Sequence, residues 1–203
     1  LLFMVRDPIG RLESSFREMH HSGWRYGIDA PYDIGRALQQ FPNMVADTRF
    51  WRLFNVFRRR VPDERMRLVF LDVFERDPAA ELARCFAFLG VDPAFVLPQA
   101  VVRLNDRSTK LYDSPALRFA RRLPLVRSCW ARLSENRRDG LICQLGLRRA
   151  FRGPVPWDSR VRRQAEVELL EDAAAILRYA GRPLETWPWV AAHIQERSGR
   201  AAA

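Results

Sequence analysis

The chain has 203 residues, of which 48% are hydrophobic, with 13 phenylalanines and 6 tryptophans. This composition excludes a disordered chain, and the length suits one sizeable domain. Lys and Arg outnumber Asp and Glu by 34 to 24, a formal net charge of +10. No apolar run approaches about 18 residues, so no membrane span is expected, and the sequence opens without a signal-peptide pattern.

The positive charge is almost entirely arginine, because Lys110 is the only lysine. Such a skew can reflect coding bias as well as selection for a polyanionic partner. A basic surface attracts phosphate, sulfate and anionic sugars. The charge is therefore compatible with a nucleotide cofactor and an acidic acceptor, and no nucleic-acid partner is expected. A basic module that binds nucleic acid or another polyanion stays open as an alternative.

The cysteine pattern argues against structural disulfide bonds and zinc sites. Cys85, Cys129 and Cys143 form no CxxC pair and leave one cysteine over, so neither a disulfide framework nor a zinc site is expected. Cys85 falls on an apolar helical face and is predicted to lie in the core. This usage indicates a reducing, cytoplasmic compartment.

The first sixteen residues carry the most informative pattern. Leu1–Val5 is an apolar run of strand length and predicts a strand buried on both faces. Arg6 follows, and Asp7-Pro8 is a helix-start signal. In open α/β sheets ligands bind at the carboxyl ends of strands, where Arg6 and the helical Ser14 can clamp a phosphate. The alternative is structural: Arg pairs with a carboxylate and Asp only caps the helix.

The run Val5–Phe16 resembles the 3′-phosphate-binding motif of the sulfotransferases that use 3′-phosphoadenosine 5′-phosphosulfate (PAPS). That motif has a strand, then R-[DN]-P, a Ser eight residues after the Arg, and an aromatic residue. In the family, the Arg and the Ser hold the 3′-phosphate. The resemblance implies that Arg6 and Ser14 are the cofactor-binding residues here.

An aromatic loop and two histidines follow the first predicted helix. Residues 23–32 contain Gly, Pro, Trp and Tyr and predict a loop that either lines an acceptor site or anchors itself to the core; anchoring is the favoured interpretation. His20 and His21 precede the loop. An imidazole titrates near neutrality and can serve as a general base, but a histidine at a helix end is more commonly a solvated cap.

The next stretch predicts a second strand-and-helix unit. Residues 33–60 predict a helix broken at Pro42, and its second segment is apolar almost all round, which is typical of a buried helix. Met66–Leu71 is a second short apolar run. Asp77-Pro78 repeats the helix-start signal, and Gly90 is a candidate C-cap. Two strands separated by helices favour a parallel sheet.

Two further segments are similar to the same family. Phe88–Asp92 matches the end of a strand–loop–helix segment of the family, although Leu71–Phe74 departs from its usual aromatic-Glu-Asp-Leu and keeps only Asp72. Gly181–Trp187 is similar to its closing G-R-x-L-x-x-W. The resemblance thus spans residues 1 to 189, which we expect to form a truncated sulfotransferase-like domain, followed by a tail over 190–203.

The region between these segments is less informative. A polar stretch contains Asn105, Arg107, Ser108 and Lys110. It occupies the place where the family has a loop that covers the nucleotide, and a basic residue there could assist Arg6. A solvated loop is the favoured interpretation for each of these residues. Leu117–Leu133 predicts an amphipathic helix that lies on a membrane or an acidic polymer or, the favoured alternative, packs on the domain with a solvated arginine face. Residues 158–180 predict a long capped helix.

The resemblance implies an α/β fold: a P-loop-NTPase-like parallel sheet flanked by helices, its N-terminal part missing, with a helix-rich C-terminal half. The sequence contains no Gly-rich Lys-Ser/Thr loop to hold the 5′-phosphosulfate. We therefore expect a fragment that holds the 3′-phosphate half of a PAPS site and is inactive alone. No metal is expected, and no catalytic residue is assigned. The acceptor is an unknown hydroxyl or amine, and carbohydrate is among the candidates. A kinase-like nucleotide enzyme, in which Arg6 binds another phosphate, is the second alternative.

Overall fold

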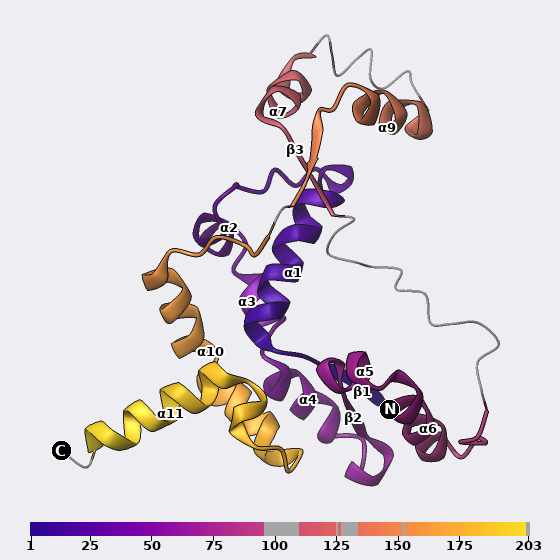
Figure 1. Cartoon of the computed structure of the whole chain (residues 1–203), viewed down its shortest axis with the longest axis vertical. Helices are drawn as coiled ribbons and strands as arrows, with labels where there is room; N and C mark the ends of the chain where they lie inside the picture. Colours follow the sequence, from indigo (N-terminus) through magenta and orange to yellow (C-terminus); the bar gives the residue numbers. More distant parts are fainter. Residues whose placement is uncertain (96–109, 125, 127–133, 152, 202–203) are drawn as a thin grey trace. The chain divides into compact units, whose positions relative to one another are not determined.

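A computed structural model of the chain describes residues 1–95, 110–124, 126, 134–151 and 153–201 (Figure 1). The chain is mixed α/β and mostly helical. It divides into two compact units: residues 1–13, 33–102 and 157–203 form the first, and residues 14–32 and 103–156 form the second. This division is finer than the single domain expected over residues 1–189.

The first unit contains the parallel strand pair that the sequence predicts. Strand β1 (Leu2–Val5) pairs with β2 (Arg67–Phe70) in parallel, in a register that places Leu2 opposite Arg67 and Val5 opposite Phe70. The expectation that β1 is buried on both faces is wrong. Leu2 is 41% exposed and Met4 55% exposed, whereas Val5 is fully buried. A short run of apolar residues does not distinguish a strand covered on one face from one covered on both.

Three helices occupy residues 33–60, one more than predicted. They are α2 (Ile34–Gln40), α3 (Asn43–Ala46) and α4 (Phe50–Arg58), followed by the short 3-10 helix η2 (Asp63–Arg65). Helix α4 is not buried all round as expected: Phe50 and Phe54 are buried, whereas Val56 and Phe57 are exposed. Its packing is one-sided, because α10 is its main neighbour.

The second strand leads into two helices that lie beside it (Figure 1). Helix α5 (Leu71–Arg76) begins directly after β2, where the sequence indicated the end of a strand. Helix α6 (Pro78–Leu89) begins at the predicted signal, because the Asp77 carboxylate accepts a hydrogen bond from Ala80 N at 3.0 Å. It ends at Gly90, whose φ of +72° is the left-handed conformation that glycine adopts without strain. Cys85 is buried, as predicted.

Two C-terminal helices complete the core of the first unit. Helix α10 (Ser159–Tyr179) confirms the long capped helix predicted over residues 158–180, and its capping residue is Asp158. The 3-10 helix η4 (Leu184–Thr186) follows, and then α11 (Pro188–Ala201). The tail expected from residue 190 is therefore helical through Ala201. The buried apolar side chains that join β1 and β2 to α4, α10 and α11 are Val5, Phe50, Phe70, Leu170, Ala173, Ala174, Ile176, Leu177, Trp187 and Val190.

The second unit is built on a different, antiparallel pair. Strand β3 (Leu111–Asp113) pairs with β4 (Arg148–Ala150). The 3-10 helix η1 (Gly23–Tyr26) and helices α7 (Pro115–Arg122) and α9 (Glu135–Gln144) belong to the same unit. Helix α1 (Pro8–His21) is continuous; it begins in the first unit and continues into the second.

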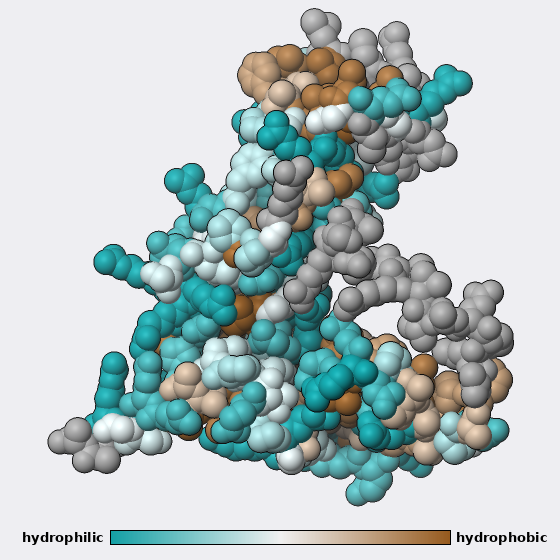
Figure 2. Space-filling view, viewed as in Figure 1, coloured by the Kyte–Doolittle hydropathy of each residue, from teal (hydrophilic) through white to brown (hydrophobic). Residues whose placement is uncertain are grey.

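Helix α7 covers the first part of the amphipathic segment predicted over 117–133, of which residues 125 and 127–133 lie outside the described residues. Leu117 is buried, but Phe119 is 66% exposed, and Figure 2 shows apolar surface over this helix. Among the described residues, no helix combines the length and the apolar character that crossing a bilayer requires.

Candidate functional site

The junction between β1 and α1 is organised by the Asp7 carboxylate. Asp7 Oδ1 accepts a hydrogen bond from Ile9 N at 3.2 Å, and Asp7 Oδ2 accepts one from Gly10 N at 3.1 Å. These are first-turn N–H groups that have no partner within the helix. The predicted capping role of Asp7 is thus confirmed. An anion at this junction would be bound by side chains, since Asp7 already occupies these two N–H groups.

A second contact holds Asp7 from the far end of the chain. Trp189 Nε1, in α11, donates a hydrogen bond to Asp7 Oδ1 at 2.8 Å. Both residues belong to the first unit. Sequence reasoning missed this contact because the partners lie 182 positions apart. The start of α1 is therefore fixed both by its own cap and by α11.

Arg6 precedes α1, whereas Ser14 lies within the helix. A Cβ atom placed on Gly10 would lie 3.5 Å from Arg6 Nη2 and 3.3 Å from Asp7 Oδ2, so the Arg6 guanidinium rests against the first turn. Gly10 and Ser14 are four residues apart and share a face of the helix. The Cα–Cβ bond of Ser14 tilts toward the helix N-terminus. Both predicted residues are half-buried.

This face offers donors of two kinds to an oxyanion. A guanidinium presents a planar fork of N–H groups, and a hydroxyl adds one O–H. Gly10 leaves the surface between them without a side chain. The arrangement can bind a phosphate or sulfate group; it contains no pairing of a nucleophile with a base.

The two histidines at the end of α1 are not solvated caps. His20 is 5% exposed, its Nε2 is hydrogen-bonded to Pro31 O at 3.0 Å, and its ring stacks on Tyr32 with centroids 5.7 Å apart. Burial and the nearby Arg118 charge lower the pKa of His20 to about 4. It is therefore neutral at physiological pH, and its pKa lies far from the range that suits a general base.

His21 is also committed to the structure. Its Nδ1 accepts a hydrogen bond from Leu111 N at 3.2 Å. Burial lowers the pKa of His21, and the positive charges of Arg148 and Lys110 act in the same direction. His21 therefore positions β3 against the end of α1.

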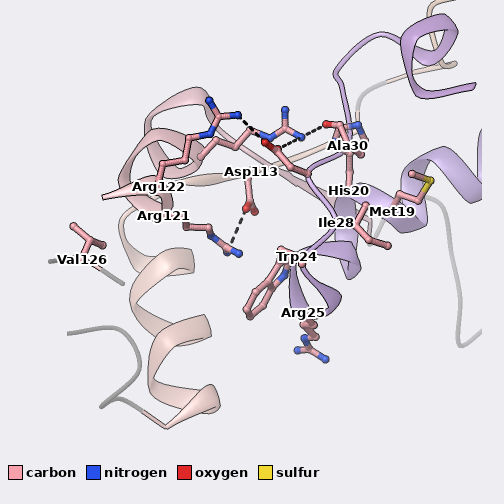
Figure 3. A pocket seen from close by; sticks show the side chains of 13 residues that line it. Met19, His20, Trp24, Arg25, Ile28, Ala30, Asp113, Arg121, Arg122 and Val126 are labelled. Carbon is pink, nitrogen blue, oxygen red and sulfur yellow. Dashed lines mark hydrogen bonds and ion pairs between the residues drawn. The ribbon is translucent and has the colours of Figure 1, made fainter. Parts of the chain in front are cut away.

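Within the second unit the aromatic loop is anchored as predicted, and it also lines a cavity; an acceptor role for that cavity stays a prediction. Tyr32 anchors the loop: the hydroxyl donates a hydrogen bond to Asp113 O at 2.5 Å. Trp24 instead lines a cavity of about 600 Å³ between the loop and α7 (Figure 3). Arg121 lies over the Trp24 ring at 4.2 Å and 3.2 Å from Asp113 Oδ2. Arg118 and Arg122 both pair with Asp29.

The arginines of α7 that line this cavity are paired: Arg118 and Arg121 are largely covered, whereas Arg122 keeps the solvent exposure expected of an arginine face on this helix. Figure 3 shows Arg121 pointing toward both Asp113 and Trp24. The indole Nε1 of Trp24 is buried and meets no hydrogen-bond acceptor among the described residues. A ligand here could accept that hydrogen bond.

Of the four polar residues proposed to lie over the nucleotide, the structure describes only Lys110. Asn105, Arg107 and Ser108 lie outside the described residues. Lys110 forms an ion pair with Glu18 of α1, within the second unit. The structure therefore assigns Lys110 a contact with the helix that carries Ser14.

Comparison of the chain with models of protein families, with curated proteins and with solved structures finds no match in any of the three. Among the described residues, no group of three or more His, Cys, Asp or Glu side chains is arranged to hold a metal ion.

Proposed function

We propose that the β1–α1 junction binds the 3′-phosphate of PAPS, as part of a sulfotransferase that moves a sulfuryl group to a hydroxyl or amine acceptor. The observation that carries the proposal is the position of the Arg6 guanidinium against Gly10, with Ser14 one helical turn further on the same face. This is the residue pair that the family resemblance implies.

The surrounding architecture supports the proposal. Two strands pair in parallel, and Arg6 follows the carboxyl end of β1, where ligands of open α/β sheets bind. Asp7 and Trp189 fix the helix start. A P-loop-NTPase-like sheet remains part of the proposal, as do the cytoplasmic location and the carbohydrate among the candidate acceptors.

The chain's own contribution is cofactor binding and orientation. When bound, PAPS supplies the sulfuryl group, which an acceptor oxygen or nitrogen takes up in an in-line displacement. Arg6 would balance charge on the 3′-phosphate, and Ser14 would donate a hydrogen bond to it. Holding the nucleotide at this remote group orients the reacting end without taking part in the chemistry.

The test compares two nucleotides that differ only in the 3′-phosphate, adenosine 3′,5′-bisphosphate and adenosine 5′-monophosphate. Calorimetry should show that the bisphosphate binds at least about tenfold more tightly, which corresponds to about 1.4 kcal/mol. Arg6→Ala should abolish this preference. Arg11→Ala is the matched control, because Arg11 lies exposed on the same helix and the charge change is identical. Equal binding of the two nucleotides by the unaltered chain would contradict the proposal.

The two alternatives give different results in the same experiments. A kinase-like enzyme should bind the 5′-monophosphate as well as the bisphosphate. A basic polyanion-binding module should bind DNA of any sequence, with an affinity that falls steeply as salt rises.

A further inference from the structure

A second cavity, in the first unit, lies beside β2 and has no role in the proposed function. Its volume is about 610 Å³, and β2, α5, α6 and the end of α10 form its walls. Four arginines line it, Arg67, Arg76, Arg84 and Arg182, together with one carboxylate, Glu81. We name these five residues and the space between them the β2 cleft.

Glu81 holds two of the four guanidinium groups in place. Its carboxylate accepts a hydrogen bond from Arg67 Nη2 at 3.0 Å and one from Arg84 Nη1 at 2.7 Å. Glu81 is only 4% exposed, so the carboxylate of this ion pair network is shielded from solvent. One carboxylate cannot balance four guanidinium groups, and the β2 cleft keeps a local excess of three positive charges.

Arg182 is held by its backbone and by an aromatic ring. Its N–H bonds to Leu177 O at 2.9 Å, and Gly181 N bonds to Arg178 O at 3.0 Å, in the pattern that ends α10. Its guanidinium carbon lies 4.2 Å from the centroid of the Phe70 ring. Packing through its face leaves the in-plane N–H groups of a guanidinium open to an acceptor.

Neither Arg76 nor Arg182 forms an ion pair within the part of the chain that the structure describes. This differs from exposed arginines elsewhere in the first unit, such as Arg49 with Glu168 and Arg163 with Glu196. Unbalanced guanidinium groups that share a cavity repel one another, and an oxyanion relieves that repulsion.

We propose that the β2 cleft binds an organic phosphate or sulfate ester. The excess charge favours a phosphate monoester, which is dianionic near neutral pH, over a sulfate monoester, which carries one negative charge. Arg182 and Arg76 supply donors that no carboxylate occupies. The cavity is much larger than a free ion needs and falls in the range of small-molecule sites. Leu68, Val73 and Tyr179 provide apolar wall for the organic part of the ester.

Phenyl phosphate and phenyl sulfate are suitable probes, measured by calorimetry at a fixed ionic strength of about 0.15 M. Arg6→Ala serves as the background, so that the β1–α1 junction does not contribute. We expect saturable binding of at least one ester, and comparison of the two shows which group the cleft prefers. Because the background lacks Arg6, failure of this experiment is separate from failure of the nucleotide test.

Substitutions within the cleft locate the binding. Arg182→Ala should weaken binding at least about tenfold, and Arg182→Lys should restore only part of it, because Lys keeps the charge and loses the fork. Arg178→Ala, exposed on the last turn of α10 and outside the cleft, should change affinity less than about twofold. Arg76→Ala, at an exposed position, gives a second reading if Arg182→Ala folds poorly. Absence of saturable binding, or equal losses in Arg178→Ala and Arg76→Ala, would overturn the proposal.

Discussion

His20 links the stability of the second unit to pH. In the unfolded chain this histidine binds a proton near its ordinary pKa of 6.5, whereas in the folded chain its pKa is lowered to about 4. The unfolded state therefore binds more protons between these values, and folding stability is full above pH 6.5 and falls as the pH drops to 4. The expected loss is about 3 kcal/mol. Urea unfolding monitored between pH 7 and pH 4 measures it.

The substitution that tests this effect is His20→Phe. It removes the hydrogen bond to Pro31 O and should cost about 1 kcal/mol at pH 7, but the free energy of unfolding should then depend less on pH. Some dependence should remain, because the pKa of His21 is lowered as well. Parallel pH profiles for His20→Phe and the unaltered chain would contradict the assignment.

Gly10 is the residue on which the proposed phosphate site depends sterically. Ala at this position raises helix propensity by about 1 kcal/mol, yet its Cβ would meet Asp7 Oδ2 at 3.3 Å and Arg6 Nη2 at 3.5 Å. We expect Gly10→Ala to weaken adenosine 3′,5′-bisphosphate binding several-fold, about 1 kcal/mol, without lowering the melting temperature. Calorimetry and thermal unfolding measure the two effects.

Gly140→Ala in α9 is the control for the Gly10 substitution, because a Cβ there meets nothing within 4 Å. It should leave nucleotide affinity unchanged. Unchanged affinity in Gly10→Ala as well would mean that the phosphate does not lie on this face of α1.

At the scale of elements, α4 has its N-terminal cap supplied by another helix. Asp172 of α10 accepts hydrogen bonds from Trp51 N at 2.9 Å and Arg52 N at 2.8 Å, while the residue at the N-cap itself, Arg49, makes no side-chain cap bond. Asp172→Ala should lower the free energy of unfolding by about 1–2 kcal/mol. Chemical denaturation followed by far-UV circular dichroism measures it.

The neighbouring Glu171 provides the control for Asp172. Glu171→Ala removes the same charge, but from an exposed pair with Arg197, and such pairs are worth about 0–1 kcal/mol. Equal destabilisation by the two substitutions would show that charge, rather than the cap, stabilises α4.

The elements that the sequence predicts are those with local signals. Strands β1 and β2 are apolar runs, and α1, α6 and α10 begin at aspartates that cap them. Strands β3 and β4 span three residues each, and the partners Leu111 and Ala150 are far apart in the chain. Nothing local specifies that pairing. Helix α11 did have a signal, Pro188 at its first position, which is a favoured place for proline.

The same distinction applies to the candidate sites. Arg6, Asp7 and Ser14 fall within one short motif, and the sequence places them on neighbouring turns. The bonds of Trp189 to Asp7 and of Asp172 to α4 join residues more than a hundred positions apart, as does the packing of Arg182 on Phe70. Such contacts are decided by how the helices pack, which no local pattern records.

For the whole molecule, each compact unit has its own buried cluster. In the first unit, Val5, Leu170 and Trp187 belong to the core that joins the sheet to the C-terminal helices, whereas Phe16 and His20 pack with Phe151 in the second. We expect heating at pH 5 to resolve two transitions, the earlier one from the second unit, because His20 destabilises only that unit as the pH falls. Differential scanning calorimetry measures this.

Single substitutions assign the two transitions. Asp172→Ala should lower the melting temperature of the later transition by about 3–5 °C per kcal/mol lost, the sensitivity expected of a unit of about 130 residues, and leave the earlier one in place. Raising the pH from 5 to 7 should move the earlier transition upward, and His20→Phe should reduce that movement. If both substitutions shift one common transition, the two units unfold as a single cooperative body, and the continuous helix α1 that runs from one to the other is the element that couples them.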